Sequence, residues 1–419
     1  MKIILKEEPV IIKTKKYSTI DFSLIFPIKY QKKYIYYPDF ISNLIVTSSH
    51  DYPTEQEFQL ARNKELIIKY RIIPRRFLNN IYLKFNFCLP DPKKVHDYNI
   101  KSAFSFIMNS ILKPNASNGS FNSDVFKREY DYFKEYYANE KVDKYSTIYR
   151  NFAKAVNDKL YNKYSYIANL KELSNIDATS LYNYYKKNIL DNHPLIYVYG
   201  NITKTEVNDL FKDYFKKEIE NVSIKKDYYY FINPRENIQY VEKKYEISDS
   251  ILYLAYMKEN LTKEELIYFY FLIDIINIPV GISPLFKKLR IDNNLVYYIN
   301  ASLMSKYGIL YLKTSFNIYK KNKVLELIQE CFNELKDKDI IEKYRKIVIR
   351  TIKDNIIKNK DYKYALFVDR ITKDLELGYS LEDYLEFYTN LDLDLFIKFI
   401  NEIKLDTIYL ARGDLDERN

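Results

Sequence analysis

The sequence predicts an α+β protein built from two duplicated domains, each a mostly antiparallel sheet with helices packed on one face. Strand-like runs of alternating apolar character are interleaved with longer runs that have helical periodicity. The second half of the chain also repeats landmarks of the first half in the same order. With 419 residues, the chain is longer than one hydrophobic core usually serves, which favours two domains of similar size.

The first half alternates strands and helices, and turn-forming residues separate them. Strands are predicted at 23–28, 80–89 and 195–201. Helices are predicted at 37–47, 102–112, 123–137 and 177–189. Ser123 is predicted to cap the helix that it begins, because its hydroxyl can accept a hydrogen bond from a free backbone N–H.

A run of mixed charge with a proline, 216–237, breaks this pattern and marks the domain junction. We therefore expect an N-terminal domain at 1–217, a linker at 218–236 and a C-terminal domain at 237–419.

Three pairs of segments support a duplication, because they occur in the same order in both halves. The pairs are YLKFNF (82–87) with YLKTSF (311–316), EKVDKYSTIYRN (140–151) with NKDYKYALFVDRI (359–371), and IYVYGN (196–201) with IYLARGD (408–414).

Composition excludes several classes of protein. The net charge is +10, but the 66 basic residues are interleaved with 56 acidic ones, so no nucleic-acid partner is predicted. No apolar run reaches the ~20 residues of a membrane span, and Glu7 and Glu8 interrupt the apolar start, so no secretory signal is expected. The expected location is the cytoplasm. Cys88 and Cys331 are predicted to be buried free thiols.

The stretch LFKKLRIDNNLVYY, residues 285–298, reads as a helix, a polar turn and a strand. Arg290 and Tyr297 bracket the turn. From the residues alone, the pair could be ordinary packing or a device that holds a peptide, since a guanidinium is a rigid donor fork for carbonyl oxygens.

This stretch is similar to the L-F-x-x-L-R-x-x-x-G-L-x-Y pattern of the insulinase/pitrilysin/processing-peptidase metallopeptidases, the inverzincins. The strand LIYVYGN (195–201) and the helix DVFKREYDYFKEY (124–136) also resemble that family. The likeness covers nearly the whole chain and is greatest to bacterial members and mitochondrial processing-peptidase subunits. It implies two duplicated domains in one chain, and in active members a zinc ion held by H-x-x-E-H.

The zinc motif itself is degenerate. Aligned to the family, Asp39, Ser42 and Asn43 stand at the first His, the Glu and the second His. Ser42 cannot act as a carboxylate base, and Asn43 is a poor zinc ligand. The resemblance places Glu129 at the family's glutamate ligand, but one carboxylate does not hold zinc, so it is expected to be a solvated helix residue or a remnant.

No histidine supplies a substitute ligand. The three histidines, His50, His96 and His193, lie in polar turns or loops, and none has a second histidine at ligand spacing. Neither a catalytic residue nor a metal site is therefore predicted in this chain.

The resemblance implies that Arg290 and Tyr297 hold substrate: in the family this Arg contacts the peptide backbone and this Tyr assists near the scissile carbonyl. Two positions depart from the family. Its glycine is Asn294 here, which tolerates a left-handed backbone, and its acidic residue is Ile291.

These features predict a non-catalytic pseudo-peptidase subunit of a heterodimeric zinc metallopeptidase. A partner of the same fold would supply H-x-x-E-H and the zinc, and this chain, which needs no cofactor of its own, would form the other half of a clamshell. The expected substrates are oligopeptides or unstructured segments. One alternative is a peptide-binding or scaffold protein of degenerate peptidase fold, which could form a homodimer. The other is a basic nucleic-acid-binding module.

Overall fold

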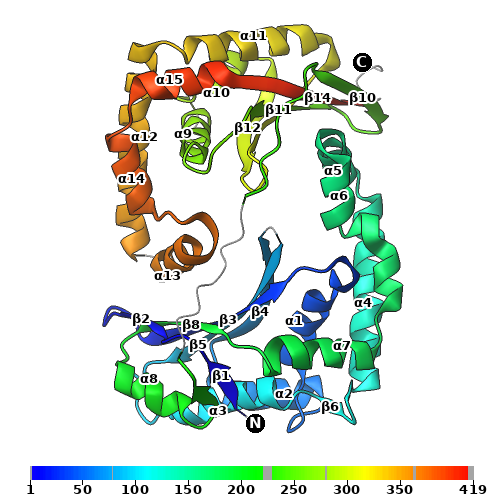
Figure 1. Ribbon diagram of the computed structural model, residues 1–419, viewed down its shortest axis with the longest axis vertical. Coiled ribbons are helices and arrows are strands. Elements are labelled where there is room, and N and C mark those ends of the chain that lie inside the picture. The colour runs from blue at the N-terminus through cyan, green and yellow to red at the C-terminus, as the bar shows by residue number, and fades with distance from the viewer. Residues whose placement is uncertain (1, 78, 220–228, 279–280, 362–364, 414–419) are drawn as a thin grey trace. The chain divides into compact units, whose positions relative to one another are not determined.

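The structure is a computed structural model that describes residues 2–77, 79–219, 229–278, 281–361 and 365–413 (Figure 1). Its internal contacts divide the chain into two units. Unit 1 contains Met1–Val142 and Asn162–Asp227, and unit 2 contains Asp143–Tyr161 and Tyr228–Asn419. The division therefore differs from the expected domain boundary at 143–161, which belong to unit 2. The expected linker lies partly outside the described residues.

Unit 1 is built on a five-stranded sheet with the order β2-β8-β3-β5-β4 (Figure 1). Its strands are β2 (Val10–Lys13), β3 (Thr19–Lys29), β4 (Lys69–Phe77), β5 (Asn80–Pro90) and β8 (Leu195–Gly200). β2 and β8 run parallel, and the other neighbouring pairs are antiparallel. Two short pairs complete the unit: β1 (Ile3–Leu5) with β9 (Phe215–Lys217), and β6 (Ala116–Ser117) with β7 (Ser120–Phe121).

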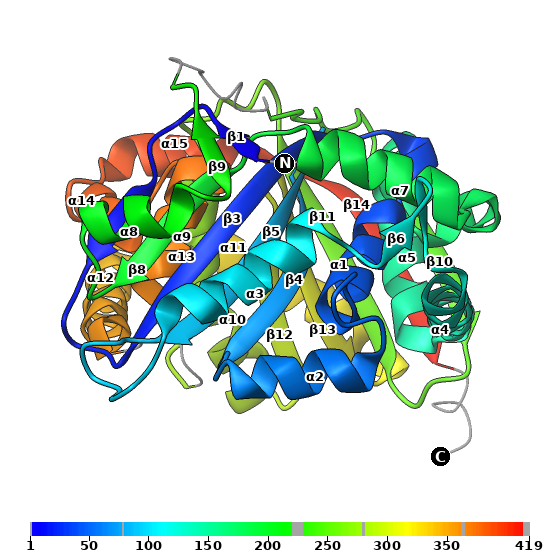
Figure 2. The same cartoon turned by 90° about the horizontal axis from the view of Figure 1, so that it is seen from below.

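Helices pack their apolar side chains on one face of this sheet. The helical segments are η1 (Lys32–Tyr34), α1 (Tyr37–Thr47), α2 (Glu55–Lys64), α3 (Ile100–Leu112), α4 (Ser123–Val142), η2 (Ile167–Asn175), α7 (Ala178–Tyr185), η3 (Lys186–Leu190) and α8 (Lys204–Phe211), while α6 (Asp158–Tyr164) crosses the division between the units. Figure 2 shows α3 lying across the strands. Contrary to expectation, Asn122 rather than Ser123 caps α4, because its side chain accepts the backbone N–H groups of Asp124 and Val125.

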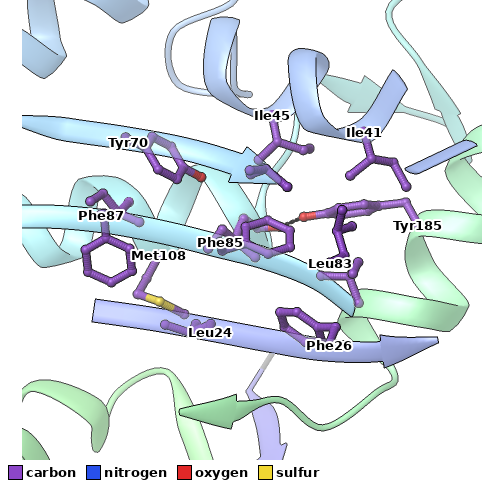
Figure 3. Close-up of a cluster of buried hydrophobic side chains, with 14 of the residues drawn as sticks. Leu24, Phe26, Ile41, Ile45, Tyr70, Leu83, Phe85, Phe87, Met108 and Tyr185 are labelled. Carbon is purple, nitrogen blue, oxygen red and sulfur yellow. Dashed lines mark hydrogen bonds between the residues drawn. The ribbon is translucent and has the colours of Figure 1, made fainter. Parts of the chain in front are cut away.

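The core of unit 1 joins α1 to the central strands (Figure 3). Ile41 and Ile45 of α1 are buried against strand residues such as Phe85. Tyr185 is fully buried, and its hydroxyl donates to the carbonyl of Ile111 at 2.6 Å, so this large side chain fills the core without leaving a polar atom unsatisfied. The core thus fixes one face of α1 and leaves its other face for different contacts.

Unit 2 repeats the topology of unit 1. Its sheet has the order β10-β14-β11-β13-β12, with one parallel pair, β10–β14, at the same end (Figure 1). The strands are β10 (Gln239–Tyr245), β11 (Ser250–Lys258), β12 (Val296–Met304), β13 (Ile309–Phe316) and β14 (Ile403–Gly413). The repeat segments 82–87 and 311–316 lie in β5 and β13, which hold the same place in the two sheets. The prediction of two duplicated α+β domains is confirmed.

Most helices of unit 2 share one core on one face of its sheet. The helical segments are α9 (Leu266–Ile276), α10 (Pro284–Phe286), η4 (Lys287–Ile291), η5 (Ile318–Lys320), α11 (Lys321–Glu334), α12 (Lys338–Asp361), α13 (Ala365–Thr372), η6 (Lys373–Leu377), α14 (Leu381–Thr389) and α15 (Leu393–Glu402). None of the helices in the described part of the chain is both long and apolar enough to cross a membrane. Cys88 and Cys331 are buried and free, as predicted.

The helix α5 (Lys144–Val156) departs from the expectation that helices cover one face only. Its apolar side chains, including Phe152, form a separate core with Tyr253 and Tyr409 of the second sheet. The rings of Phe152 and Tyr253 stack with centroids 4.5 Å apart. A helix from the first half of the sequence therefore belongs structurally to unit 2, because its apolar stripe is buried there.

Candidate functional site

The amphipathic character of α1 positions the degenerate motif. Phe40, Ile41, Leu44 and Ile45 are buried, so the helix is held by that face. Asp39, Ser42 and Asn43 lie at spacings of three and four on another face, where all three keep partial solvent exposure.

The helix α4 brings Glu129 to Asn43. The Nδ2 of Asn43 donates to Oε2 of Glu129 at 3.0 Å. Arg128 donates to the other carboxylate oxygen, Oε1, through Nε at 3.2 Å and Nη2 at 3.1 Å. The Glu129 side chain is only 9% exposed, so it is not the solvated helix residue that was one expectation, and its carboxylate is saturated by donors from the protein.

Asp39 belongs to a different cluster. Its Oδ2 accepts a hydrogen bond from the hydroxyl of Tyr137 at 3.1 Å. Burial raises the pKa of Asp39 to about 6, although hydrogen bonds from Tyr137 and Tyr166 act in the opposite direction. The Ser42 hydroxyl turns back to the Asp39 carbonyl at 2.6 Å, so the three aligned positions do not converge on one point.

These residues do not fit a zinc ion. Zinc in proteins takes lone pairs from three or four Cys, His or carboxylate ligands, whereas Asn43 presents N–H groups to Glu129 and Asp39 is engaged by phenols. His50 is exposed beside Asp51, and His96 is exposed beside Asp97. Within the described residues, no group of three or more His, Cys, Asp or Glu side chains could hold a metal.

The structure brings the second predicted pair together. Arg290 lies in η4, and Tyr297 is the second residue of β12. The guanidinium carbon is 5.5 Å from the centroid of the Tyr297 ring, within the range of a cation–π contact. Arg290 also donates from Nη1 to Oδ1 of Asn294 at 2.8 Å.

The backbone between Arg290 and Tyr297 has two irregular features, a left-handed residue and a β-bulge. Asn294 has φ = 48°, a left-handed conformation that asparagine tolerates better than most residues. The pairing of β12 with β13 shifts register between Val296 and Tyr298, a bulge that re-aims the intervening side chain. Tyr297 is 61% exposed as a result, and β12 is an edge strand of its sheet.

Sequence reasoning missed two participants of the first site, Arg128 and Tyr137. Arg128 directly precedes Glu129, and adjacent residues do not face each other along an ideal helix, so periodicity gave no signal for their pairing. Tyr137 is one of 45 tyrosines, so its residue type did not distinguish it. Its contact with Asp39 depends on how α1 and α4 pack, which no local pattern records.

Comparisons with known proteins agree with this picture. Residues 175–348 match the family model described as the peptidase M16 inactive domain. A "probable inactive metalloprotease YmfF" of Bacillus subtilis (strain 168) is 23% identical over 257 residues. The match covers 58% of this chain and 57% of that protein, so the chain spans a little over half the length of this curated relative.

Two solved structures share the fold over almost all of both chains. A conserved protein from Enterococcus faecalis V583 has a TM-score of 0.81 with 20% identity, covering 97% of this chain and 96% of its own. A chain of Complex III2 from Candida albicans has a TM-score of 0.67 with 13% identity, covering 98% and 95% respectively.

Proposed function

We propose that the chain is a non-catalytic member of the peptidase M16 family and the peptide-holding subunit of a heterodimeric zinc metallopeptidase. In this proposal a second chain of the same fold carries H-x-x-E-H and the zinc. The chain described here contributes substrate contacts, and it needs no cofactor of its own.

The observation that carries the proposal is the contrast between the two predicted sites. The residues around Glu129 are tied to one another and offer nothing to a metal. Arg290 and Tyr297 stay together, and in the described part of the chain the Tyr297 hydroxyl has no hydrogen-bond partner. A guanidinium and a phenol on an exposed surface can donate to peptide carbonyl oxygens, and a phenol can stabilise a developing oxyanion.

The position of the pair beside β12 suits an extended peptide. An edge strand has backbone N–H and C=O groups available for pairing with another chain. A peptide that adds to such an edge gains main-chain hydrogen bonds, while Arg290 and Tyr297 supply side-chain contacts at one end. Only an oligopeptide or an unstructured segment can adopt this extended form, which defines the proposed substrate class.

A chain with this fold in Complex III2 of Candida albicans supports assembly with other subunits. The partner proposed for this chain is a protein of similar length with an intact H-x-x-E-H motif, encoded near it. The cytoplasm stays the predicted location for the pair.

The test is reconstitution of the pair with matched variants. We expect the two proteins to co-purify and to cleave unstructured peptides together, with zinc bound only by the partner. Arg290→Ala should lower kcat/KM of the pair by at least about tenfold, because a contact to the substrate backbone is lost. Lys287→Ala is the control, since Lys287 lies in the same short helix and, among the residues that the structure describes, its ammonium group pairs only with Asp292 at 3.0 Å.

Two results would overturn the proposal. One is stoichiometric zinc binding and peptide cleavage by the purified chain alone. The other is a reconstituted pair in which Arg290→Ala and Lys287→Ala have equal activity. Peptide binding without any H-x-x-E-H partner would instead support the scaffold alternative.

A further inference from the structure

Glu129 stands where the family resemblance places a glutamate zinc ligand, and here its carboxylate is bound by protein donors. The carboxylate of Glu129 accepts a hydrogen bond from Asn43 of α1. An almost fully buried carboxylate must be paired with a cation or saturated with donors, because its desolvation is costly. The structure provides both, through Arg128 and Asn43.

Arg128 reaches beyond its neighbour in the sequence. Its Nη1 lies 3.2 Å from Oε2 of Glu55, the first residue of α2. Its Nη2 lies 3.4 Å from the hydroxyl of Thr47, the last residue of α1. One guanidinium on α4 therefore contacts residues of α1 and α2 in addition to Glu129.

This arrangement repeats the task of a metal ion with different chemistry. A zinc ion would neutralise Glu129 and join helices by accepting lone pairs. The guanidinium neutralises the same carboxylate and joins helices by donating N–H groups, which it does in a fixed planar fork. The N–H groups of Arg128 and Asn43 both point at Glu129, so a divalent ion approaching this carboxylate would meet a positive charge and an amide donor.

We propose that Arg128 is a built-in replacement for the family's metal ion: its guanidinium is the permanent counter-cation of Glu129, it links α4 to α1 and α2, and it closes the site to divalent metals. This inference does not require the proposed partner or substrate. It concerns how the buried Glu129 carboxylate is neutralised by the protein itself, and testing it needs no peptidase activity.

The first test is a double-mutant cycle on the full chain, with thermal unfolding as the readout. Arg128→Ala should lower Tm, because Glu129 stays buried without its counter-cation. Adding Glu129→Gln should restore part of this loss, because the neutral amide needs no cation. Lys127→Ala is the control: Lys127 is exposed, precedes Arg128 on the same helix and has no ion pair in the described part of the chain.

A charge-specific rescue distinguishes the proposal from simple packing. If Arg128 acted only by covering apolar surface, the two substitutions would lower Tm additively. Additive losses, or an Arg128→Ala variant that unfolds at the same temperature as Lys127→Ala, would overturn the proposal.

The second test asks whether Arg128 excludes zinc. Asp39→His, Ser42→Glu and Asn43→His together restore the aligned motif, and the triple variant is compared with the same variant plus Arg128→Ala. Zinc affinity is measured by competition with a chromogenic chelator, after circular dichroism has shown that both variants are folded. We expect at least about tenfold tighter binding when Arg128 is absent. Equal affinity would overturn the proposal, as would no zinc binding by either variant, since another feature would then exclude the metal.

Discussion

Arg235 joins the end of α5 to β14, and we expect its removal to destabilise unit 2. Arg235 forms an ion pair through Nη1 with Oδ2 of Asp406 in β14. Its Nη2 donates to the carbonyl oxygens of Ala155 at 3.0 Å and Val156 at 2.8 Å, which are the last residues of α5. One side chain thus satisfies a buried carboxylate and two carbonyl groups that a helix end leaves without partners.

The expected loss of unfolding free energy in Arg235→Ala follows from the burial of the Asp406 carboxylate. The Asp406 side chain is 1% exposed, and removing one partner of a buried ion pair costs about 3–5 kcal/mol. Within the described residues, two donors to Asp406 would remain after Arg235→Ala: the Thr407 hydroxyl at 2.6 Å and the backbone N–H of residue 235 at 2.8 Å. Arg235 is also 39% exposed, so water can reach the vacated space. We therefore expect Arg235→Ala to lower the unfolding free energy by about 3 kcal/mol, the lower end of this range.

The assay is urea unfolding followed by circular dichroism, with hydrogen exchange of α5 amides to locate the effect. The free energy is taken from the transition that involves unit 2, because a chain with two units need not unfold in one step. Asp406→Asn in the Arg235→Ala background should recover at least about 1 kcal/mol, since no buried charge then lacks a partner. The control Arg370→Ala removes an exposed pair with Asp374 and should cost less than about 1 kcal/mol.

Arg235 does not hold α5 as described if Arg235→Ala lowers the unfolding free energy no more than the Arg370→Ala control does. The same conclusion follows if Asp406→Asn lowers the unfolding free energy further instead of restoring part of it, or if hydrogen exchange of the α5 amides is unchanged.

Two further predictions concern ionisable groups in the two cores. Burial raises the pKa of Asp39 to about 6 from a usual value of 3.8, so the folded chain holds a proton that the unfolded chain releases between these values. The unfolding free energy of the wild type should therefore fall by about 2 kcal/mol relative to Asp39→Asn as pH rises from 4 to 6. Urea unfolding at pH 4, 5, 6 and 7 measures this difference, and a constant difference would contradict the prediction. Burial also raises the pKa of the Cys331 thiol to about 12, so a thiol reagent at pH 8 should modify it only after unfolding, and modification of the native chain within minutes would be the opposite result.

Much of the fold was predictable because it depends on local periodicity. The run 80–89 alternates in character and forms β5, and the helix predicted at 37–47 is α1, Tyr37–Thr47. The duplication was readable because YLKFNF and YLKTSF occupy the same position in two sheets of the same order. The placement of α5 was not predictable from its sequence position, because an apolar stripe shows that a helix is buried and does not show against which sheet.

The candidate sites divide in the same way. Spacing and family resemblance selected Arg290 and Tyr297, and the structure places the guanidinium over the ring. The same reasoning selected Asn43 and Glu129, which are hydrogen-bonded although 86 residues separate them. The role of Arg290 and Tyr297 in binding substrate stays a prediction.

Residue type and spacing alone indicate the two-domain α+β architecture and the absence of an intact H-x-x-E-H motif. Three further features depend on the packing of distant segments: Glu129 is paired with Arg128 and Asn43, Asp39 contacts tyrosine side chains, and α5 packs on the second sheet. Each of these depends on which helix faces approach one another. Packing of distant segments sets that approach, and no local pattern contains it.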